Sequence, residues 1–284
     1  ERARPSAAYG TRPPSGSLQS TRHAEPMPFE LREFDVPAEP FFSGPIPRTS
    51  AIIGDASLND VCHVGSRIWA VGERGVICFS DNAGATWAAR VTPMECSLQS
   101  VCFLTNTIGW VAGTRTRPDT GLQSSAVLLH TRDGGQTWTD LTSAAGPRTI
   151  GTSHLPASVL PGIRHIQYFG LDTAVAVTAP MHQRSGNGIF RSEDGGHTWS
   201  PIPVDQTGGP WSAGHFVSES DGIVVGHHQS YAAVVADQAV VINRPEPTLR
   251  AIRSVSLDTE ARGWIAGDGC FILTTEDAGV TWKQ

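Results

Sequence analysis

Short apolar runs separated by turn residues alternate along the chain from about residue 51 to its C-terminal end. The runs are rich in Val, Ile and aromatic residues, which favour β-strands, and the segments between them are rich in Gly, Asp, Asn and Ser, which favour turns. The 30 Gly and 20 Pro residues also argue against a bundle of helices. The pattern therefore predicts an all-β protein of short antiparallel strands.

These runs and turns form a repeat with three columns. One column is a turn segment, here called the box, with the pattern Ser/Thr-x-Asp/Asn-x-Gly-x-Thr-Trp, and its copies are SDNAGATW (80–87), TRDGGQTW (131–138), SEDGGHTW (192–199) and TEDAGVTW (275–282). Another column is an apolar strand, which reads IWAVG at 68–72, GWVAG at 109–113, TAVAV at 173–177, GIVVG at 222–226 and GWIAG at 263–267. The third column is the run that starts each unit, at Leu58, Leu98, Ile163 and Ile252. Seven of the eight Trp residues fall in the first two columns, so the repeat explains most of the tryptophan usage.

The length of the repeat identifies its structural unit. The unit is 41 residues where it is shortest, from Gly72 to Gly113 and from Gly226 to Gly267, and it holds four short apolar runs. This size and strand number are typical of a propeller blade. We therefore predict a β-propeller of four-stranded antiparallel blades, with five blades visible at about 54–95, 96–141, 160–204, 211–247 and 249–284, as part of a seven-bladed ring. The fourth of these blades lacks a box.

The box has a structural explanation as the turn between the third and fourth strands of a blade. Asp or Asn accepts backbone N–H bonds within the turn, Gly provides a position with positive φ, Thr adds a hydroxyl bond, and Trp buries its ring. We therefore assign a structural role to twelve box residues: Asn82, Gly84, Trp87, Asp133, Gly135, Trp138, Asp194, Gly196, Trp199, Asp277, Gly279 and Trp282.

In these segments the chain resembles proteins with the Asp-box, or bacterial neuraminidase repeat. Such repeats occur in sialidases, xyloglucan-type endoglucanases, sortilin-like receptors and the photosystem II assembly/stability factor family. The match is best in GWIAGDGCFILTTEDAGVTW (263–282) and VGERGVICFSDNAGATW (71–87), and it is most similar to the last of these families. That resemblance covers residues 51–284 and implies a non-enzymatic, seven-bladed scaffold for membrane-protein assembly. It also implies a periplasmic or secreted location.

Residues 1–50 differ in composition from the rest, because they hold nine of the 20 Pro and six of the 20 Arg residues. Such a segment buries too little apolar surface to offset its ordering entropy, so we predict that it is disordered. Its stretch MPFELREFDV (27–36) has enough apolar residues to dock as a strand. The predicted domain organisation is therefore a Pro/Arg-rich segment at 1–50 followed by the propeller at 51–284.

Charge and composition exclude several function classes. The formal net charge of −6 argues against a general nucleic-acid binder, and no apolar run is long enough to predict a transmembrane segment. A single Lys, Lys283, leaves no Walker-type phosphate loop or lysine-based catalysis. The five Cys residues have no C-x-x-C spacing, which favours buried free thiols over a zinc site or disulfide framework. His227 and His228 are consecutive in a predicted strand and point to opposite faces, so we predict no metal site and no cofactor.

Three insertions extend the same predicted face of the propeller, at neighbouring blades. They are the loops at 114–125 and 178–187 between second and third strands, and the connection at 142–162 between blades. Loops grown on one side of a rigid scaffold often carry binding function. Basic residues gather in these loops and at the start of two innermost strands: Arg115, Arg117, Arg148, His154, His182 and Arg184 in the loops, and Arg164 and Arg253 at the strand starts.

The resulting hypothesis is a cationic patch that binds an acidic peptide or protein partner, because guanidinium groups match carboxylates bidentately. An alternative is solvated loop arginines without a ligand. A further alternative is a secreted sialidase-like or glucanase-like glycoside hydrolase, or a carbohydrate-binding module. The insertion loops hold almost no acidic residues and the chain has only three Tyr, so no catalytic residues are predicted and a glycan or small-molecule ligand stays open.

Overall fold

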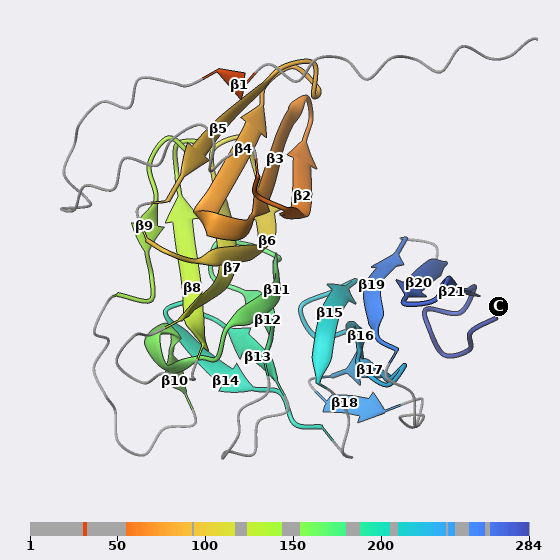
Figure 1. Cartoon of the computed structure of the whole chain (residues 1–284). Helices are drawn as coiled ribbons and strands as arrows, with labels where there is room; N and C mark the ends of the chain where they lie inside the picture. Colours follow the sequence, from red (N-terminus) through yellow and green to blue (C-terminus); the bar gives the residue numbers. More distant parts are fainter. Residues whose placement is uncertain are drawn as a thin grey trace, which may run out of the picture.

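The computed structural model describes residues 31–32, 55–92, 94–116, 124–143, 154–179, 188–204, 210–236, 238–241, 250–258 and 262–283. These residues form five sheets, antiparallel except for one short edge strand, that follow one another around a common centre, as the blades of a propeller do (Figure 1). The prediction of an all-β propeller with five visible blades is therefore confirmed. The seven-bladed ring stays a prediction.

Each blade is a meander in which chain order runs from the innermost strand outward. From inside to outside, the strands are β2 (Leu58–Val64), β3 (Arg67–Gly72), β4 (Val76–Ser80) and β5 (Trp87–Val91) in the first blade; β6 (Ser97–Phe103), β7 (Gly109–Thr116), β8 (Ser124–Thr131) and β9 (Thr139–Asp140) in the second; β11 (Ile163–Tyr168), β12 (Ala174–Thr178), β13 (Ile189–Ser192) and β14 (Thr198–Pro201) in the third; β15 (Trp211–Phe216), β16 (Gly222–Gly226), β17 (Tyr231–Val235) and β18 (Gln238–Val241) in the fourth; and β19 (Ile252–Leu257), β20 (Gly263–Gly267) and β21 (Phe271–Thr275) in the fifth. Two short 3-10 helices, η1 (Glu73–Gly75) and η2 (Ala157–Val159), lie in connections.

The outer edges of the blades differ. Two-residue strands add to two of them, since β1 (Leu31–Arg32) lies parallel to β5 and β10 (Leu155–Pro156) lies antiparallel to β14. In the fifth blade, the outer neighbour of β21 is Lys283, which pairs with Thr274 through an isolated bridge. β1 falls within the segment predicted to dock as a strand, but the rest of that segment, like most of residues 1–50, lies outside the described residues.

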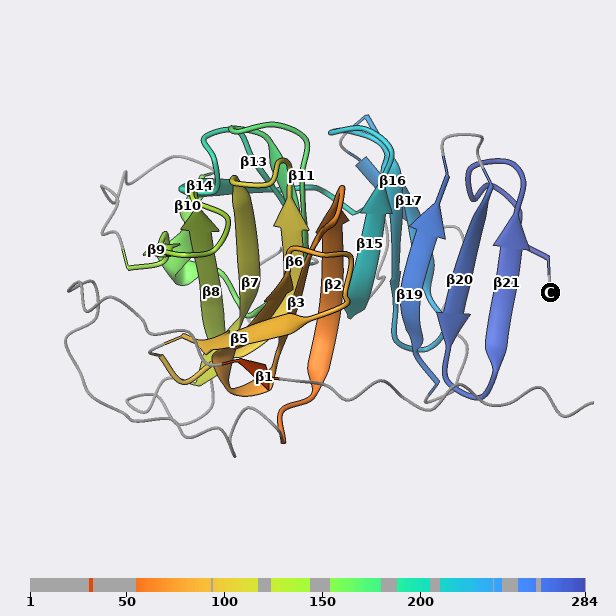
Figure 2. The ribbon, with the colours of Figure 1, turned by 90° about the horizontal axis from the view of Figure 1, so that it is seen from above.

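Aromatic stacking between neighbouring blades forms much of the core. Trp69 of β3 stacks on Phe103 of the second blade, and Trp110 of β7 stacks on Tyr168 of the third, each with ring centroids 3.7 Å apart. Both Trp side chains are 1% exposed. The second-strand Trp of one blade therefore packs on an aromatic residue of the next blade's innermost strand, and Figure 2 shows these strands side by side.

Polar side chains on the innermost strands also join each blade to the next. The Asp60 carboxylate of β2 accepts the backbone N–H of Val101 in β6 at 2.9 Å, and the Ser100 hydroxyl of β6 accepts the N–H of Ile166 in β11 at 3.2 Å. Gln167 accepts the N–H of Phe216 at 3.0 Å in the same manner. Because the innermost strand has no neighbour of its own sheet on the channel side, these bonds satisfy donors at its free edge.

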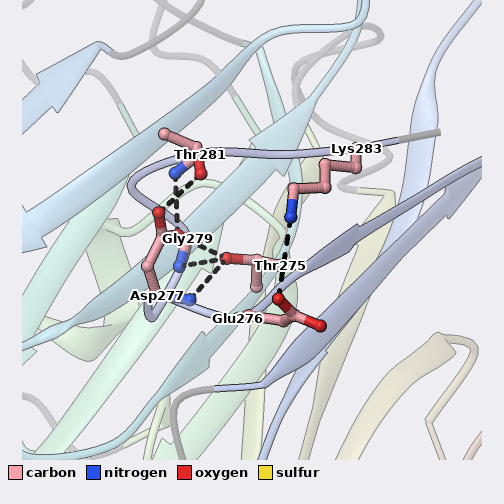
Figure 3. Close-up of polar contacts among 6 residues, drawn as sticks. All are labelled: Thr275, Glu276, Asp277, Gly279, Thr281 and Lys283. Atoms are coloured by element: carbon pink, nitrogen blue, oxygen red, sulfur yellow. Dashed lines mark hydrogen bonds and ion pairs between the residues drawn. The ribbon is translucent and has the colours of Figure 1, made fainter.

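Figure 3 shows the box of the fifth blade, which closes on itself through side-chain hydrogen bonds. The Asp277 carboxylate accepts from the backbone N–H of Thr281 at 2.8 Å and from its hydroxyl at 2.5 Å, and the Thr275 hydroxyl accepts from the N–H of Gly279 at 2.9 Å. The bonds from Thr281, together with the bond that the Thr275 hydroxyl donates to Asp277 at 2.7 Å, lower the pKa of Asp277 to about 2, because they favour the ionised carboxylate. The other three boxes repeat the arrangement, with Asn82, Asp133 and Asp194 as acceptors.

Two details differ from the sequence prediction. Each box places two successive residues at positive φ rather than one, and the first of the two is Ala83 (φ 56), Gly134 (φ 77), Gly195 (φ 75) or Ala278 (φ 56). The expectation of buried thiols was wrong for Cys270, which is exposed, while Cys78 and Cys96 are buried and Cys62 and Cys102 are half-buried.

Candidate functional site

A β-bulge sits near the start of every innermost strand and aims one side chain away from the regular pleat. The register of each innermost strand with its neighbour shifts there, between Leu58 and Asp60 in the first blade and between Ile163 and His165 in the third. A bulge leaves one residue unpaired and re-aims its side chain. The bulged residues of the five blades are Asn59, Gln99, Arg164, Ser212 and Arg253.

The two arginines at this position, in the third and fifth blades, are held in different ways. The half-buried Arg164 donates from Nη1 to the carbonyl oxygen of Trp211 at 2.8 Å. The exposed Arg253 forms a bidentate pair with Asp268, with distances of 2.9 Å from Nε to Oδ1 and 3.0 Å from Nη2 to Oδ2. Both guanidinium groups are therefore fixed in orientation by the fold.

The charge of Arg253 acts on Arg164, although the two residues belong to different blades. Burial, and then the charge of Arg253, lowers the pKa of Arg164 below its ordinary value. The hydrogen bonds that Arg253 donates to the Asp268 carboxylate raise the pKa of Arg253, and the same bonds lower the pKa of Asp268. The fold thus places two arginines that are far apart in the sequence within electrostatic reach of each other, and the Asp268 carboxylate pairs with Arg253.

His227 is the fourth member of this group, which we call the mouth cluster: Arg164, His227, Arg253 and Asp268. His227 follows β16 and bridges to Ala251 just before β19. Burial, followed by the charges of Arg164 and Arg253, lowers its pKa, while Asp268 opposes the shift. The imidazole is therefore neutral at pH 7, and it offers one donor and one acceptor beside the guanidinium groups.

The sequence prediction found the arginines of this cluster and missed the other two members. We placed His227 and His228 in a strand, and this was wrong, because β16 ends at Gly226 and His228 has φ 57 in the following turn. Asp268 was missed because it lies outside the insertion loops, in the short turn after β20. The blade topology could have located both residues, because the turn between the second and third strands emerges at the same end of a blade as the start of its innermost strand.

The other predicted binding residues are dispersed or lie outside the described residues. Arg115 lies near the end of β7, where its Nε donates to the Ser125 hydroxyl at 3.4 Å. His154 lies next to the outer strands of the third blade, where its Nδ1 is 2.7 Å from the Ser200 hydroxyl. The structure therefore does not bring His154 to the mouth cluster. The remaining predicted residues, Arg117, Arg148, His182 and Arg184, lie outside the described residues.

A small groove beside His154 runs along the box of the third blade. Its volume is about 240 Å³, and its lining residues are His154, Arg191, Glu193, Asp194, Thr198 and Ser200. The Asp194 carboxylate is occupied by the box, because it accepts from the N–H and hydroxyl of Thr198 at 2.8 and 2.7 Å. The groove therefore mixes two basic side chains, His154 and Arg191, with two acidic ones and does not match the chemistry of the mouth cluster.

Two general properties bear on the kind of site. Among the described residues, no cluster of three or more His, Cys, Asp or Glu side chains is arranged to hold a metal ion. The same part of the chain contains no helix long and apolar enough to cross a membrane.

Comparison with known proteins shows similarity at the level of fold. No family model matches the chain, and no curated protein matches it. A solved structure described as YCF48 bound to D1 peptide superposes with a TM-score of 0.54 and 21% identity, over 81% of this chain and 68% of that one. The WD40 β-propeller domain of Doa1 superposes with a TM-score of 0.50 and 12% identity, over 81% and 68% of the two chains. YCF48 from Cyanidioschyzon merolae gives a TM-score of 0.48 and 16% identity, over 84% and 86%. The chain is thus similar in fold to propellers that include a peptide-bound one.

Proposed function

We propose that the chain is a non-enzymatic β-propeller scaffold that binds an acidic peptide segment of a protein partner at the mouth cluster. The observation that carries the proposal is that Arg164 and Arg253 occupy the same bulge position in the third and fifth blades, where the Arg253 charge acts on Arg164 and His227 and where Asp268 pairs with Arg253. Arginine forks bind carboxylates through paired, charge-assisted hydrogen bonds. An acidic side chain of a peptide would displace Asp268 from Arg253 and take its place.

The exposure of the Arg253–Asp268 pair supports this exchange. The two side chains are 61% and 38% exposed, and ion pairs on the surface contribute little net stability because water screens them. A peptide carboxylate therefore has little interaction energy to overcome when it replaces Asp268. The likeness in fold to a structure described as YCF48 bound to D1 peptide agrees with a peptide ligand, although that ligand is a property of YCF48.

The finer part of the proposal is the partner. The resemblance of the box repeats to photosystem II assembly/stability factors suggests a membrane protein that is being assembled, in a periplasmic or secreted compartment. A glycoside hydrolase of sialidase or glucanase type is the alternative. It predicts turnover of fluorogenic sialosides or β-glucans by the purified chain, which the scaffold proposal does not.

Fluorescence anisotropy with a labelled oligoglutamate peptide tests the proposal, with an oligoglutamine peptide of equal length as the ligand control. Arg253→Gln is expected to weaken oligoglutamate binding by about tenfold, because a charge-assisted hydrogen bond is lost. Asp268→Asn is expected to strengthen it, because the competing carboxylate is removed. Arg132→Gln, an exposed change in a box, is the matched control and leaves the affinity unchanged.

Two outcomes contradict the proposal. One is equal binding of oligoglutamate by the native chain and by the variant with both Arg164→Gln and Arg253→Gln. The other is equal affinity for oligoglutamate and oligoglutamine, since the proposed recognition is of carboxylates. Affinity should also fall as the ionic strength rises, because the cluster is solvent-accessible.

A further inference from the structure

The groove along the box of the third blade lies on one face of the outer strands of that blade. Arg191 of β13 pairs with Ser200 of β14, and the Ser200 hydroxyl lies 2.7 Å from Nδ1 of His154, just before β10. Figure 1 shows β13, β14 and β10 next to one another. Trp199, the neighbour of Ser200, points to the opposite face and is fully buried. The groove therefore lies on the face that turns away from the second blade.

The groove is bordered by parts of the fold on both sides. The third blade packs on the second blade through one core cluster and on the fourth blade through another. Arg191 reaches the fourth blade, because its Nη2 donates to the carbonyl oxygen of Glu219 in the turn after β15. The groove is thus a feature of a blade with a neighbour on each side.

Side chains of opposite charge occupy the two ends of the groove. Arg191 and His154 lie in one row across the strands. Glu193 and Thr198 lie two residues further along the same two segments, about 7 Å away, and Asp194 follows Glu193 in the box. The groove thus has a basic row next to an acidic row.

The acidic row can receive a cation without losing a contact of its own. Asp194 keeps its negative charge while it accepts from the N–H and hydroxyl of Thr198 at 2.8 and 2.7 Å. The Glu193 side chain is exposed, and its carboxylate forms no ion pair within the described part of the chain. A positively charged group can therefore approach Glu193 without displacing another side chain.

The box turn does not require these charges. At the position of Arg191, directly before the box, the other three copies of the repeat have Phe79, His130 and Thr274. At the position of Glu193 they have Asp81, Arg132 and Glu276. Among the four boxes, an arginine before the box and an acid at its second residue occur together in the third blade alone. The charge pattern of the groove is therefore a property of this blade and not of the repeat.

We propose that this groove binds a free α-amino acid, with its carboxylate against Arg191 and His154 and its ammonium group against Glu193. Such a molecule carries one positive and one negative charge a short distance apart, so it complements a basic row beside an acidic row. Both contacts are charge-assisted hydrogen bonds. The site is separate from the mouth cluster and does not rest on the function proposed there.

Charge and size both favour this class of ligand. The two carboxylates of the groove repel a simple anion, and the Arg191 guanidinium repels a simple cation. The volume of about 240 Å³ is smaller than the roughly 300–1,000 Å³ of pockets for drug-sized ligands. A small zwitterion therefore fits the groove better than a larger molecule or one with a single charge.

Ligand-observed NMR titration of the full chain with L-alanine tests the proposal. L-Alaninamide, which lacks the carboxylate, and N-acetyl-L-alanine, which lacks the ammonium group, are the ligand controls. L-Alanine is expected to bind at least about tenfold more tightly than either control, because each control loses a charge-assisted contact. The titrations are performed at low ionic strength, since salt screens charges in an exposed groove.

A substitution at Glu193 assigns the binding to the groove. Glu193→Gln is expected to weaken L-alanine binding by about tenfold and to remove the preference for L-alanine over N-acetyl-L-alanine. Because Glu193 is exposed, this variant is expected to keep the native thermal midpoint. Asp81→Asn, the same loss of a carboxylate at the same position of the first box, is the matched control and leaves L-alanine binding unchanged.

Three outcomes overturn the proposal. One is the absence of saturable L-alanine binding to the native chain. Another is equal binding of L-alanine and N-acetyl-L-alanine, since the ammonium group would then not be recognised. The third is equal L-alanine affinity of Glu193→Gln and Asp81→Asn, because the bound molecule would then lie outside this groove.

Discussion

The box turns allow a prediction in which two neighbouring alanines respond with opposite sign to the same substitution. Ala83 has φ 56, in the left-handed region, while Ala85, two residues later in the same box, does not have a positive φ. The left-handed conformation costs a residue with a Cβ about 1–2 kcal/mol, whereas glycine adopts it freely. Ala83→Gly is therefore expected to stabilise the chain, and Ala85→Gly to destabilise it.

The magnitude follows from two opposing terms. Relief of the left-handed strain gains about 1–2 kcal/mol, and the greater freedom of glycine in the unfolded chain costs about 0.5–1 kcal/mol. The net gain for Ala83→Gly is about 0.5–1 kcal/mol, which corresponds to a rise in the thermal midpoint of up to about 2–4 °C for a chain of this size. Ala278 has the same φ of 56 in the fifth blade, so Ala278→Gly gives a gain of similar size. The two boxes are in different blades, so their effects should add.

The reverse substitution provides a second comparison. Gly195 occupies the same box position in the third blade with φ 75, and a Cβ there would lie 3.1 Å from the carbonyl oxygen of Leu171. Gly195→Ala is therefore expected to lower the thermal midpoint by at least as much as Ala83→Gly raises it. Circular dichroism during thermal unfolding measures all of these variants. Equal lowering of the midpoint by Ala83→Gly and Ala85→Gly would refute the reasoning, because it would show that the left-handed conformation carries no cost at this position.

Three other predictions concern packing, pH and thiol chemistry. Trp69→Ala should reduce the free energy of unfolding by about 3–5 kcal/mol, because the ring is buried against Phe103. Trp264→Ala, at the equivalent but exposed position, should change the free energy of unfolding by less than about 1 kcal/mol. Denaturant titrations measure both variants, and equal effects would contradict this prediction. Burial, and then the neighbouring His215, lowers the pKa of His165 to about 4, and its Nε2 has no hydrogen-bond partner among the described residues. As the pH falls, the imidazole is therefore protonated in the unfolded chain before it is protonated in the folded chain. The free energy of unfolding has its full value above about pH 6.5 and falls by up to about 3 kcal/mol as the pH drops toward 4. His165→Gln should flatten this part of the pH profile. Burial raises the pKa of the Cys102 thiol to about 11 and also raises the pKa of Cys62 and Cys78, whereas Cys270 is exposed. A thiol reagent should therefore label the folded chain rapidly at Cys270, and Cys270→Ser should remove that rapid phase.

The fold was readable from the sequence because its determinants are local and repeated. A box such as TEDAGVTW closes through bonds between residues two to four positions apart, and the alternation of apolar positions sets which strand face is buried. The repeat also places Arg164 and Arg253 at the same position in two blades, the start of the innermost strand, so the sequence predicted that both lie at the same end of the propeller. Asp268 and His227 were missed because the sequence of a short turn does not indicate which residues of other strands lie next to it.

Only the tertiary structure decided how residues in equivalent positions differ in environment. GWVAG and GWIAG are nearly the same strand, yet Trp110 is buried against Tyr168 and Trp264 is 48% exposed. The local sequence determines where a side chain points, but burial depends on whether another blade stands in front of it. The same reason separates Arg164, which reaches Trp211 of the next blade, from Arg253, which turns to Asp268 of its own blade.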